Sequence, residues 1–312
     1  MLLDVEDILP ILRCPLSGSP LVRVENQLYS SHDSVKSVYN IVQRYPVLVD
    51  FGESVLSPKD IKILDSVITR HSYQGLAKIA KRLVSPPQSV TAKNIEKIFS
   101  LLSKDKEPPN VLLIGGGMVG QGMQRFYTDP FVKLVAFDIY GSSSVQFIAD
   151  AHNIPLPGES FDLVIIQAVL EHVLEPGQVV SEIHRVLRQN GIVYAETPFL
   201  QHVHEGAYDF TRFTEIGHRY LFRNFTLIDS GASAGAGTQL LWSLDNFFRG
   251  IFRSRKVGKF IKLCCFWLQY FDDFIPESYN VDAASGVFFL GRKSTLPISR
   301  SSIISHYKGA QQ

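Results

Sequence analysis

Three glycines and one aspartate have the spacing of a nucleotide-binding turn. Gly115, Gly117 and Gly120 fit the pattern G-x-G-x-x-G after an apolar run at 111–114, and Asp138 ends the next apolar run, 23 residues after Gly115. Glycine permits positive φ and lets the backbone approach a ligand closely. A carboxylate placed after the following strand typically binds ribose hydroxyls in doubly wound folds. Because strand-to-helix turns also use glycine for structural reasons alone, this pattern needs support from the rest of the chain.

The segments after this turn alternate between strand-like runs and an amphipathic helix. Strands are expected at 145–149, 161–167 and 192–196, and apolar residues recur every three or four positions over 177–189. We expect this helix to end in a left-handed cap at Gly191. Such alternation predicts an α/β fold with a parallel sheet, whose ligands bind beyond the carboxyl ends of the strands.

Residues 148–198 carry a more specific pattern. They read IADAHNIPLPGESFDLVIIQAVLEHVLEPGQVVSEIHRVLRQNGIVYAETP, with an acidic loop, P-L-P-G-E-S-F-D before a strand, L-E-H after it and R-V-L-R-Q-N-G at the end of the helix. This string resembles the core of class I S-adenosylmethionine-dependent methyltransferases, in particular those similar to methyltransferase type 11. The resemblance implies a Rossmann-like seven-stranded sheet with helices on both faces. Together with 111–122 it covers about a third of the chain, and it extends more weakly to the strand near residue 290.

The resemblance also implies a cofactor, S-adenosylmethionine, and the residues that would bind it. The three glycines would line its methionine and ribose, and Asp138 would bind the ribose hydroxyls. Asp150 and the backbone of Ala151 would face the adenine, and Gln167 would lie under the cofactor. One position departs from the family: an acidic residue usually stands two places before the first glycine, and here that residue is Leu113. This departure leaves room for a site that binds the cofactor poorly.

Titratable and aromatic residues crowd the loop that follows the last of these strands, residues 197–214, TPFLQHVHEGAYDFTRFT. A hydroxyl acceptor needs a base near the strand ends. We expect His204 or Glu205 to accept the proton, with His172 of L-E-H as a further candidate, and Arg212 to hold an anionic or polyhydroxyl group. The other expected substrate residues are His202, Tyr208 and Asp209.

The same loop has a structural explanation that stays open. Tyr208, Phe210 and Phe213 could belong to the core, and Asp209 with Arg212 could form a local ion pair.

The first fifty residues differ in character from the rest. Residues 1–52 have short alternating runs with Gly and Pro between them, which predicts a small β-rich module. The module resembles the zinc-ribbon-like domains of methyltransferase activators, which begin with C-P-x-C and close with Y-P-I. Cys14 stands at the first ligand position, but Ser17 replaces the second and no later cysteine pair follows, so we expect no zinc and no other metal site. Substrate presentation and subunit contact both remain open as its role.

Three further segments complete the expected organisation. Residues 53–109 form a helical connector, with one helix over DIKILDSVITRH from Asp60 and another over NIEKIFSLL from Asn94. Residues 110–292 form the main domain, and residues 293–312 are Ser-rich and expected to be a flexible tail.

Within the main domain, a helical insertion is expected at about 240–275. It has six Lys or Arg and no acid between Asn246 and Lys262, followed by an apolar, aromatic half to residue 274. Such a stretch can lie on an anionic membrane surface or cover a lipid-linked acceptor. It can equally be a helix that packs on the sheet with its charges in water.

Composition narrows the classes of protein that fit. The 312 residues, with 45% hydrophobic residues and a net charge of +1, suffice for one large core and carry no basic signature of nucleic-acid binding. Three cysteines give no disulfide framework and favour a reducing, cytoplasmic setting. The N-terminus is acidic where a secretory signal is basic, and no run approaches the roughly 18 apolar residues of a membrane span. The oligomeric state is left open.

These features predict methyl transfer from S-adenosylmethionine to a small-molecule or glycan- or lipid-linked acceptor, at a hydroxyl group. The stretch HEG-x-YDF-x-RFT, from His204 to Thr214, is similar to that of methyltransferases of polysaccharide assembly. The alternative is a catalytically weak, methyltransferase-like scaffold or regulatory subunit. A nicotinamide-dependent oxidoreductase would share the glycine turn and Asp138 but would leave P-L-P-G-E-S-F-D and L-E-H unexplained.

Overall fold

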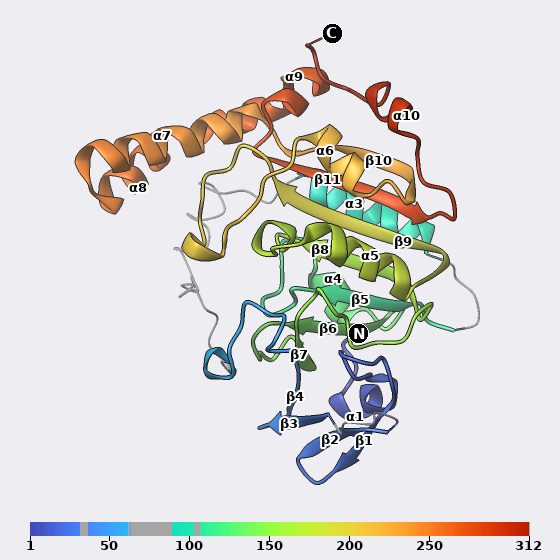
Figure 1. The fold of residues 1–312 in the computed structure, drawn as a ribbon. Coiled ribbons are helices and arrows are strands. Elements are labelled where there is room, and N and C mark those ends of the chain that lie inside the picture. The colour runs from blue at the N-terminus through green and yellow to red at the C-terminus, as the bar shows by residue number, and fades with distance from the viewer. Residues whose placement is uncertain (32–36, 62, 64–88, 103–106, 312) are drawn as a thin grey trace.

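The structure is a computed structural model of the chain and describes residues 1–31, 37–61, 63, 89–102 and 107–311 (Figure 1). In the expected connector, the helix predicted from Asp60 to residue 71 lies almost wholly outside the described residues. A short 3-10 turn, η2 (Pro58–Asp60), is described there. The second predicted helix is confirmed as α3 (Ser89–Leu101).

The main domain is built on a sheet of seven strands in the order β7-β6-β5-β8-β9-β11-β10. Neighbours from β7 to β9 pair in parallel, whereas β11 runs antiparallel to both β9 and β10. The bounds are β5 (Asn110–Ile114), β6 (Lys133–Asp138), β7 (Phe147–Ala149), β8 (Phe161–Gln167), β9 (Leu187–Pro198), β10 (Phe225–Ala234) and β11 (Gly286–Lys293). The predicted α/β class and the Rossmann-like sheet are confirmed.

The N-terminal residues add four strands to this sheet. After α1 (Val5–Ile8) and η1 (Leu9–Ile11), the antiparallel strands are β1 (Leu21–Val24), β2 (Gln27–Ser30), β3 (Val38–Val42) and β4 (Tyr45–Leu48). Strand β4 pairs in parallel with β7, so the described residues form one sheet of eleven strands rather than the seven expected. The module is β-rich as predicted, but it is continuous with the main sheet.

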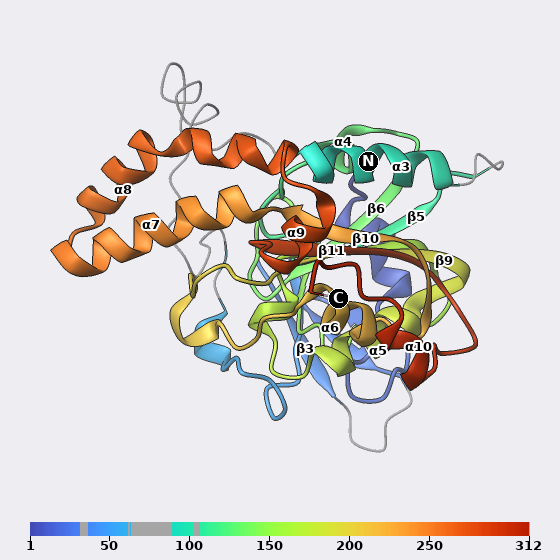
Figure 2. The same cartoon turned by 90° about the horizontal axis from the view of Figure 1, so that it is seen from above.

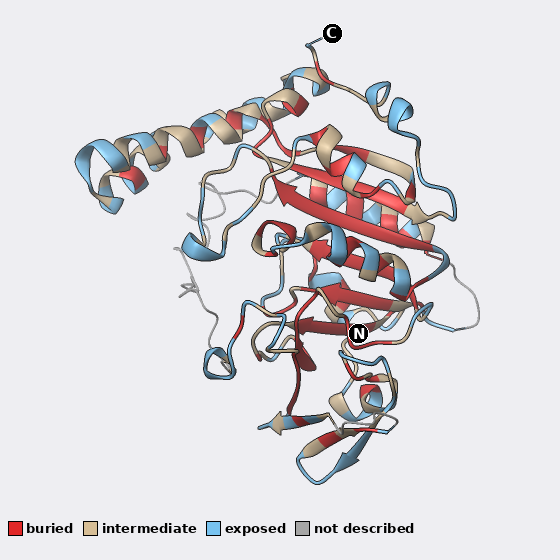
Figure 3. Ribbon diagram, viewed as in Figure 1, coloured by how far each residue is buried: buried red, intermediate tan, exposed pale blue. Residues whose placement is uncertain are grey.

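Helices cover both faces of the sheet, as Figures 1 and 2 show. Alternate strand residues point to opposite sides, and both sides are buried (Figure 3). On one face, Leu113 and Ile165 lie in the apolar cluster with α3 and with α4 (Gln124–Thr128). On the other, Ile114 and Ile166 lie in the cluster with α5 (Pro176–Val186) and α6 (Glu215–Leu221).

The end of α5 differs from the sequence prediction. The helix stops at Val186 and β9 begins at Leu187, because the chain goes directly into pairing with β8. The residue with left-handed φ is Asn190, at 63°, and not Gly191.

The predicted insertion is a pair of helices that projects from the body of the molecule (Figures 1 and 2). It consists of α7 (Ala236–Phe252), α8 (Arg255–Cys264) and the 3-10 segment η5 (Phe266–Asp273). The chain then forms α9 (Glu277–Asp282) and β11. Among the described residues, no helix has the length and apolarity needed to cross a membrane.

The C-terminal segment differs from the flexible tail that we expected. It forms α10 (Arg300–Ile304) and then returns to the main domain. The Lys308 ammonium donates to the Ser230 carbonyl at 2.7 Å, and the Tyr307 hydroxyl donates to the Asp282 carboxylate at 2.8 Å. These contacts hold the segment on β10 and α9.

Candidate active site

A cavity of about 590 Å³ lies at the carboxyl ends of the parallel strands. These ends are at the left of Figure 1, where the loops after β5, β6, β8 and β9 meet. Its walls include all the expected cofactor residues except Gly117, and all three expected catalytic residues. The lining residues that matter below are Gly115, Gly120, Asp138, Asp150, Ala151, Gln167, Glu171, His172, Glu196, His204, Glu205 and Tyr208.

The glycine turn brings the backbone against the Asp138 carboxylate. Gly115 has a φ of 78°, which favours glycine. The backbone N–H of Gly117 donates to Asp138 Oδ2 at 2.8 Å, and a Cβ on Gly117 would lie 2.7 Å from the same oxygen. The N–H of Ile139 donates to Oδ1 at 2.7 Å. Two backbone donors therefore fix the orientation of the carboxylate at the end of β6.

Asp150, directly after β7, is buried and hydrogen-bonded to its own loop and to Ser54. Its Oδ1 accepts from the backbone N–H of His152 at 3.0 Å and contacts the ring Nδ1 of His152 at 2.6 Å, and its Oδ2 accepts from the Ser54 hydroxyl. Burial by itself raises the pKa of Asp150, but these hydrogen bonds outweigh it and hold the pKa below its ordinary value. Sequence reasoning missed Ser54 and His152, although His152 follows Asp150 in the quoted motif.

Gln167 and Glu196 form a polar pair in the cavity lining, to which Leu113 contributes an apolar side chain. Leu113 is buried in the apolar layer below the cavity. Gln167 Nε2 donates to Glu196 Oε2 at 2.7 Å, and the Thr91 hydroxyl of α3 donates to Glu196 Oε1 at 2.7 Å. A Cβ on Gly120 would lie 2.3 Å from Gln167 Oε1. Glu196 was not among the predicted site residues, although its position at the end of a strand before Thr197-Pro198 was a signal for it.

Four titratable side chains from two loops meet in the cavity lining. Glu171 and His172 belong to η3 (Leu170–His172), which follows β8, and His204 and Glu205 precede η4 (Gly206–Tyr208). His172 Nε2 lies 3.6 Å from Glu171 Oε1 and 3.8 Å from Glu205 Oε2. The rings of His172 and His204 are 5.2 Å apart, edge to face. The predicted catalytic residues are thus brought together, and Glu171 joins them.

Burial shifts the proton affinities of this group. Glu171 is fully buried, and desolvation raises the pKa of its carboxyl to about 8 although the Arg212 charge opposes the shift. Desolvation also lowers the pKa of His172 below its ordinary value. Because a carbonyl can only accept, the contact of 2.6 Å between His172 Nδ1 and the Tyr208 carbonyl places the ring proton on Nδ1. The Nε2 atom of the neutral ring is then an acceptor that faces the carboxyl groups of Glu171 and Glu205.

Arg212 holds the loop rather than facing the cavity. Its guanidinium donates to the Asp209 carboxylate, to the Gln201 carbonyl at 2.9 Å and to the Thr211 carbonyl at 2.7 Å. Burial raises the pKa of Asp209, but its hydrogen bonds to Arg212 and to the His204 backbone outweigh this and hold it well below its ordinary range. The ion-pair explanation of these two residues is therefore correct, and a direct substrate role for Arg212, Asp209 or His202 is not supported, since none of them lines the cavity.

The aromatic residues of the loop differ in burial. Tyr208 and Phe210 are 38% and 41% exposed, so the explanation that they are core residues is wrong, and Tyr208 lines the cavity. Phe213 is partly buried and packs its ring 5.9 Å from that of His218.

Comparison with known proteins gives a family match in the central segment of the chain. No curated protein matches the chain in sequence. One similar solved structure is the complex between the Haloferax volcanii Trm112 methyltransferase activator and a methyltransferase, with 16% identity and a TM-score of 0.44 over 71% of this chain and 97% of that one. Another is phosphoethanolamine N-methyltransferase 2 of Haemonchus contortus in complex with S-adenosyl-L-methionine, with 14% identity and a TM-score of 0.43 over 70% and 56%. A family model described as a methyltransferase domain matches residues 121–195, which carry β6 to β8, α5 and most of β9.

Proposed function

We propose that this protein transfers a methyl group from S-adenosylmethionine to a hydroxyl group of a small-molecule or glycan-like acceptor. The observation that carries the proposal is one cavity with two unlike walls. Asp138 and Asp150 follow β6 and β7, whereas His172 and Glu205 follow β8 and β9, so the two sets flank β5 and its glycine turn. The family match to a methyltransferase domain covers the strands that carry most of these residues.

The chain's own residues fit this cofactor. Asp138 is oriented by two backbone donors, with no Cβ on Gly117 to block approach, and it suits the ribose hydroxyls. Asp150 with the Ala151 backbone takes the adenine end. We assign Glu196, beside Gln167 in the cavity wall, to the amino group of the methionine, because Leu113 offers no carboxylate there.

The chemistry asks the protein mainly for position and for one proton acceptor. When bound, S-adenosylmethionine supplies a methyl group on a sulfonium centre. Glu205, His172 and His204 line the cavity, and we assign them to the acceptor side, where one of them accepts the hydroxyl proton. Arg212, through Asp209, holds the backbone N–H of His204 at 2.9 Å from the Asp209 carboxylate and so keeps the loop in place.

Titration calorimetry with S-adenosylhomocysteine tests the cofactor site. We expect micromolar binding that weakens about tenfold to a hundredfold in Asp138→Ala, since a hydrogen bond to a charged group contributes about 1.5–3 kcal/mol. Asp229→Ala is the matched control, because this aspartate pairs with Lys97 on the sheet edge, away from the cavity. Binding of NADH in place of S-adenosylhomocysteine would overturn the proposal. Failure to bind either ligand would favour a scaffold or regulatory subunit.

We also propose that the projecting segment α7–α8–η5 brings this site to an anionic membrane surface, in the cytoplasm. Ser233 and Ala234, at the end of β10 before α7, line the cavity. The projecting segment extends from the same side of the sheet (Figure 1). Phe247, Phe260 and Phe274 are 61%, 62% and 81% exposed on it, which suits an interfacial position. A lipid-linked glycan held at that surface would have its hydroxyl groups near the cavity.

A further inference from the structure

Glu171 is a buried carboxylate without a hydrogen-bond partner. Its exposed fraction is 0%, and neither carboxylate oxygen has a hydrogen-bond partner among the described residues. A buried carboxylate in this position is costly unless a cation or donor compensates it. Its backbone is well held, because its carbonyl accepts from the N–H groups of Phe210 and Thr211 at 2.8 and 3.3 Å. The backbone of Glu171 is therefore held in place, while its buried carboxyl group has no hydrogen-bond partner among the described residues.

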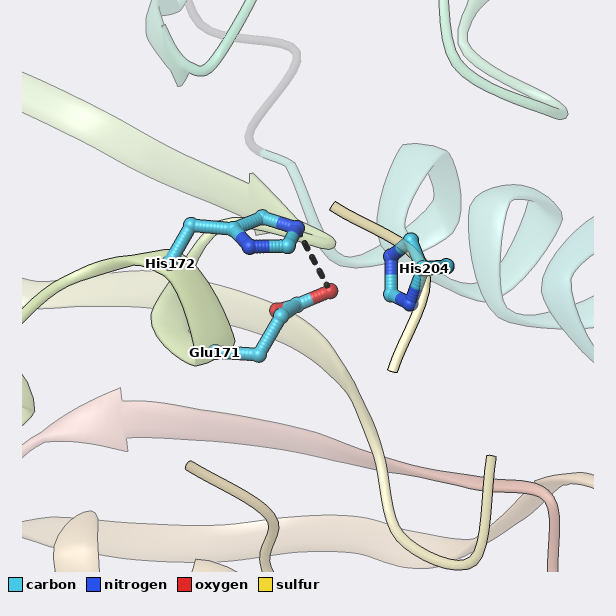
Figure 4. A group of neighbouring side chains, drawn as sticks. All are labelled: Glu171, His172 and His204. Carbon is cyan, nitrogen blue, oxygen red and sulfur yellow. Dashed lines mark ion pairs between the residues drawn. The ribbon is translucent and has the colours of Figure 1, made fainter. Parts of the chain in front are cut away.

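Two imidazoles meet this carboxylate at the cavity wall. One ligand-type atom from each of Glu171, His172 and His204 lies within 4.8 Å of the others. Figure 4 shows Glu171 and His172 on one short turn and His204 facing them from the neighbouring loop. An ion with ligand distances of about 2.0–2.2 Å holds its donors roughly 3–4 Å apart, so these atoms would need to close by about an ångström.

The outer contacts of both rings are those of metal-binding histidines. His172 donates its Nδ1 proton to the Tyr208 carbonyl, which turns Nε2 toward Glu171. His204 Nδ1 lies 3.3 Å from the His202 carbonyl and 3.4 Å from Asp209 Oδ2. Such carbonyl and carboxylate partners fix the tautomer and orientation of a ligand imidazole. Arg212 in turn fixes Asp209.

We propose that Glu171, His172 and His204 bind a divalent transition-metal ion. Two imidazoles and one carboxylate suit such ions better than Mg²⁺ or Ca²⁺, which prefer oxygen ligands throughout. Three protein ligands leave coordination positions open toward the cavity. This departs from the sequence-based expectation of no metal site, because the three ligands are spread over 171–204 and only the fold joins them.

The ion would act on the acceptor side, and this part of the inference rests on the proposed function. A hydroxyl group bound to a divalent ion loses its proton more easily and is held in a fixed place. His172 and His204 then serve as ligands. Glu205, 3.8 Å from His172, remains as the proton acceptor of the three candidates. The acceptor class narrows to hydroxyl compounds that can coordinate a metal, such as vicinal diols.

Metal binding can be measured without turnover. Tag-free protein, stripped of metal, is titrated with Zn²⁺ and separately with Mn²⁺, and the bound ion is counted by elemental analysis. We expect one ion per chain, bound at least about tenfold more weakly in Glu171→Gln and in His204→Ala. The controls are His184→Ala and Glu175→Gln. His184, on α5, contacts the carbonyl of Ser294 after β11, and Glu175 is exposed.

Two outcomes would overturn the metal site: no binding of either ion by the wild-type chain, or binding that is unchanged in both Glu171→Gln and His204→Ala. S-adenosylhomocysteine affinity, measured on every variant, reports whether each remains folded. His204 lies in a surface loop, so its variant keeps the test informative if Glu171→Gln fails to fold. Metal binding without S-adenosylhomocysteine binding would count against the proposed function and leave the metal site standing.

Discussion

The titratable side chains after β8 and β9 divide into those that line the cavity and those that hold the loop. His172, His204 and Glu205 line the cavity, whereas Asp209 and Arg212 bond to each other and to the loop backbone. Residue type alone could not make this division, because an arginine near a predicted site suits an anionic substrate equally well.

Removing the candidate base should lower turnover and leave cofactor affinity intact. We expect Glu205→Gln to reduce kcat about a hundredfold or more, since general base catalysis typically contributes 10²–10⁴-fold. His204→Ala should also lose activity. Release of S-adenosylhomocysteine in the presence of polyol or glycan acceptors measures turnover, and calorimetry measures affinity. Unchanged turnover in both variants would exclude these two residues as the catalytic group, and Glu175→Gln, outside the cavity, is the control.

The sequence predicted the cavity residues at the strand ends better than the contacts that surround them. Asp138, Asp150 and Gln167 each end or follow an apolar strand, and parallel strands place such residues at one edge. Glu171 and Glu196 were missed because their importance lies in burial and in contacts with α3 and with the loop after β9. These contacts join residues far apart in the chain.

At the scale of elements, α6 carries a buried histidine that should make stability depend on pH. His218 is fully buried, and desolvation lowers its pKa to about 3, against an opposing influence from the Glu215 carboxylate. Between pH 6.5 and 3 the unfolded chain binds a proton at this position and the folded chain does not. The free energy of unfolding is therefore greatest above the unfolded pKa of this histidine. As the pH is lowered toward 3, this group reduces it by about 1.4 kcal/mol per pH unit.

Urea unfolding at pH 7.5, 6.5 and 5.5 can check this dependence. His218→Gln, which keeps a polar group near the Thr197 hydroxyl, should flatten the pH slope of the free energy of unfolding below 6.5 by about 1 kcal/mol per unit. Equal slopes in the two proteins would contradict the assignment. The ring signals of His218 in the wild-type protein, followed by NMR, should show no titration above pH 5.

The sequence predicted whether a segment is a helix or a strand where its apolar run was long. It did not predict where each element ends. The strands of the main sheet follow from runs such as FDLVIIQ, which is buried on both faces. The end of α5 was misplaced because β9 takes Leu187 into its pairing with Phe161, and tertiary pairing overrides helix periodicity there. The C-terminal segment looked loose from its serines, yet Tyr307 and Lys308 dock it.

At the scale of the whole molecule, the projecting segment gives the surface a basic, aromatic extension. Arg253, Arg255, Lys256 and Lys259 are exposed, whereas Arg249 pairs with Asp245 and Lys262 lies over the Trp242 ring. Four exposed cations beside exposed phenylalanines are complementary to an anionic bilayer surface in charge and in apolarity.

Co-sedimentation with vesicles tests this surface. We expect binding to vesicles rich in phosphatidylserine at low salt, little binding to neutral vesicles, and loss of binding at high salt. Reversing three charges together, with Arg255→Glu, Lys256→Glu and Lys259→Glu, should weaken binding by about a hundredfold or more, because each contributes about 1 kcal/mol. The matched control reverses exposed charges elsewhere, with Arg23→Glu, Arg44→Glu and Arg300→Glu. Absence of binding to anionic vesicles at low salt would remove the membrane proposal.

The pairing of β4 with β7 bears on how the chain folds as it is synthesised. Val47 and Leu48 leave the ribosome about a hundred residues before their partners Ile148 and Ala149. Leu2 likewise pairs with Leu134, which is synthesised much later. Closing such a long loop is slow compared with local pairing. Any nascent chain shorter than about 150 residues therefore presents an apolar, unpaired strand edge, the kind of edge that pairs with other chains. The free edge of β4 therefore stays unpaired while about a hundred further residues are synthesised, and a chaperone that covers it would act early.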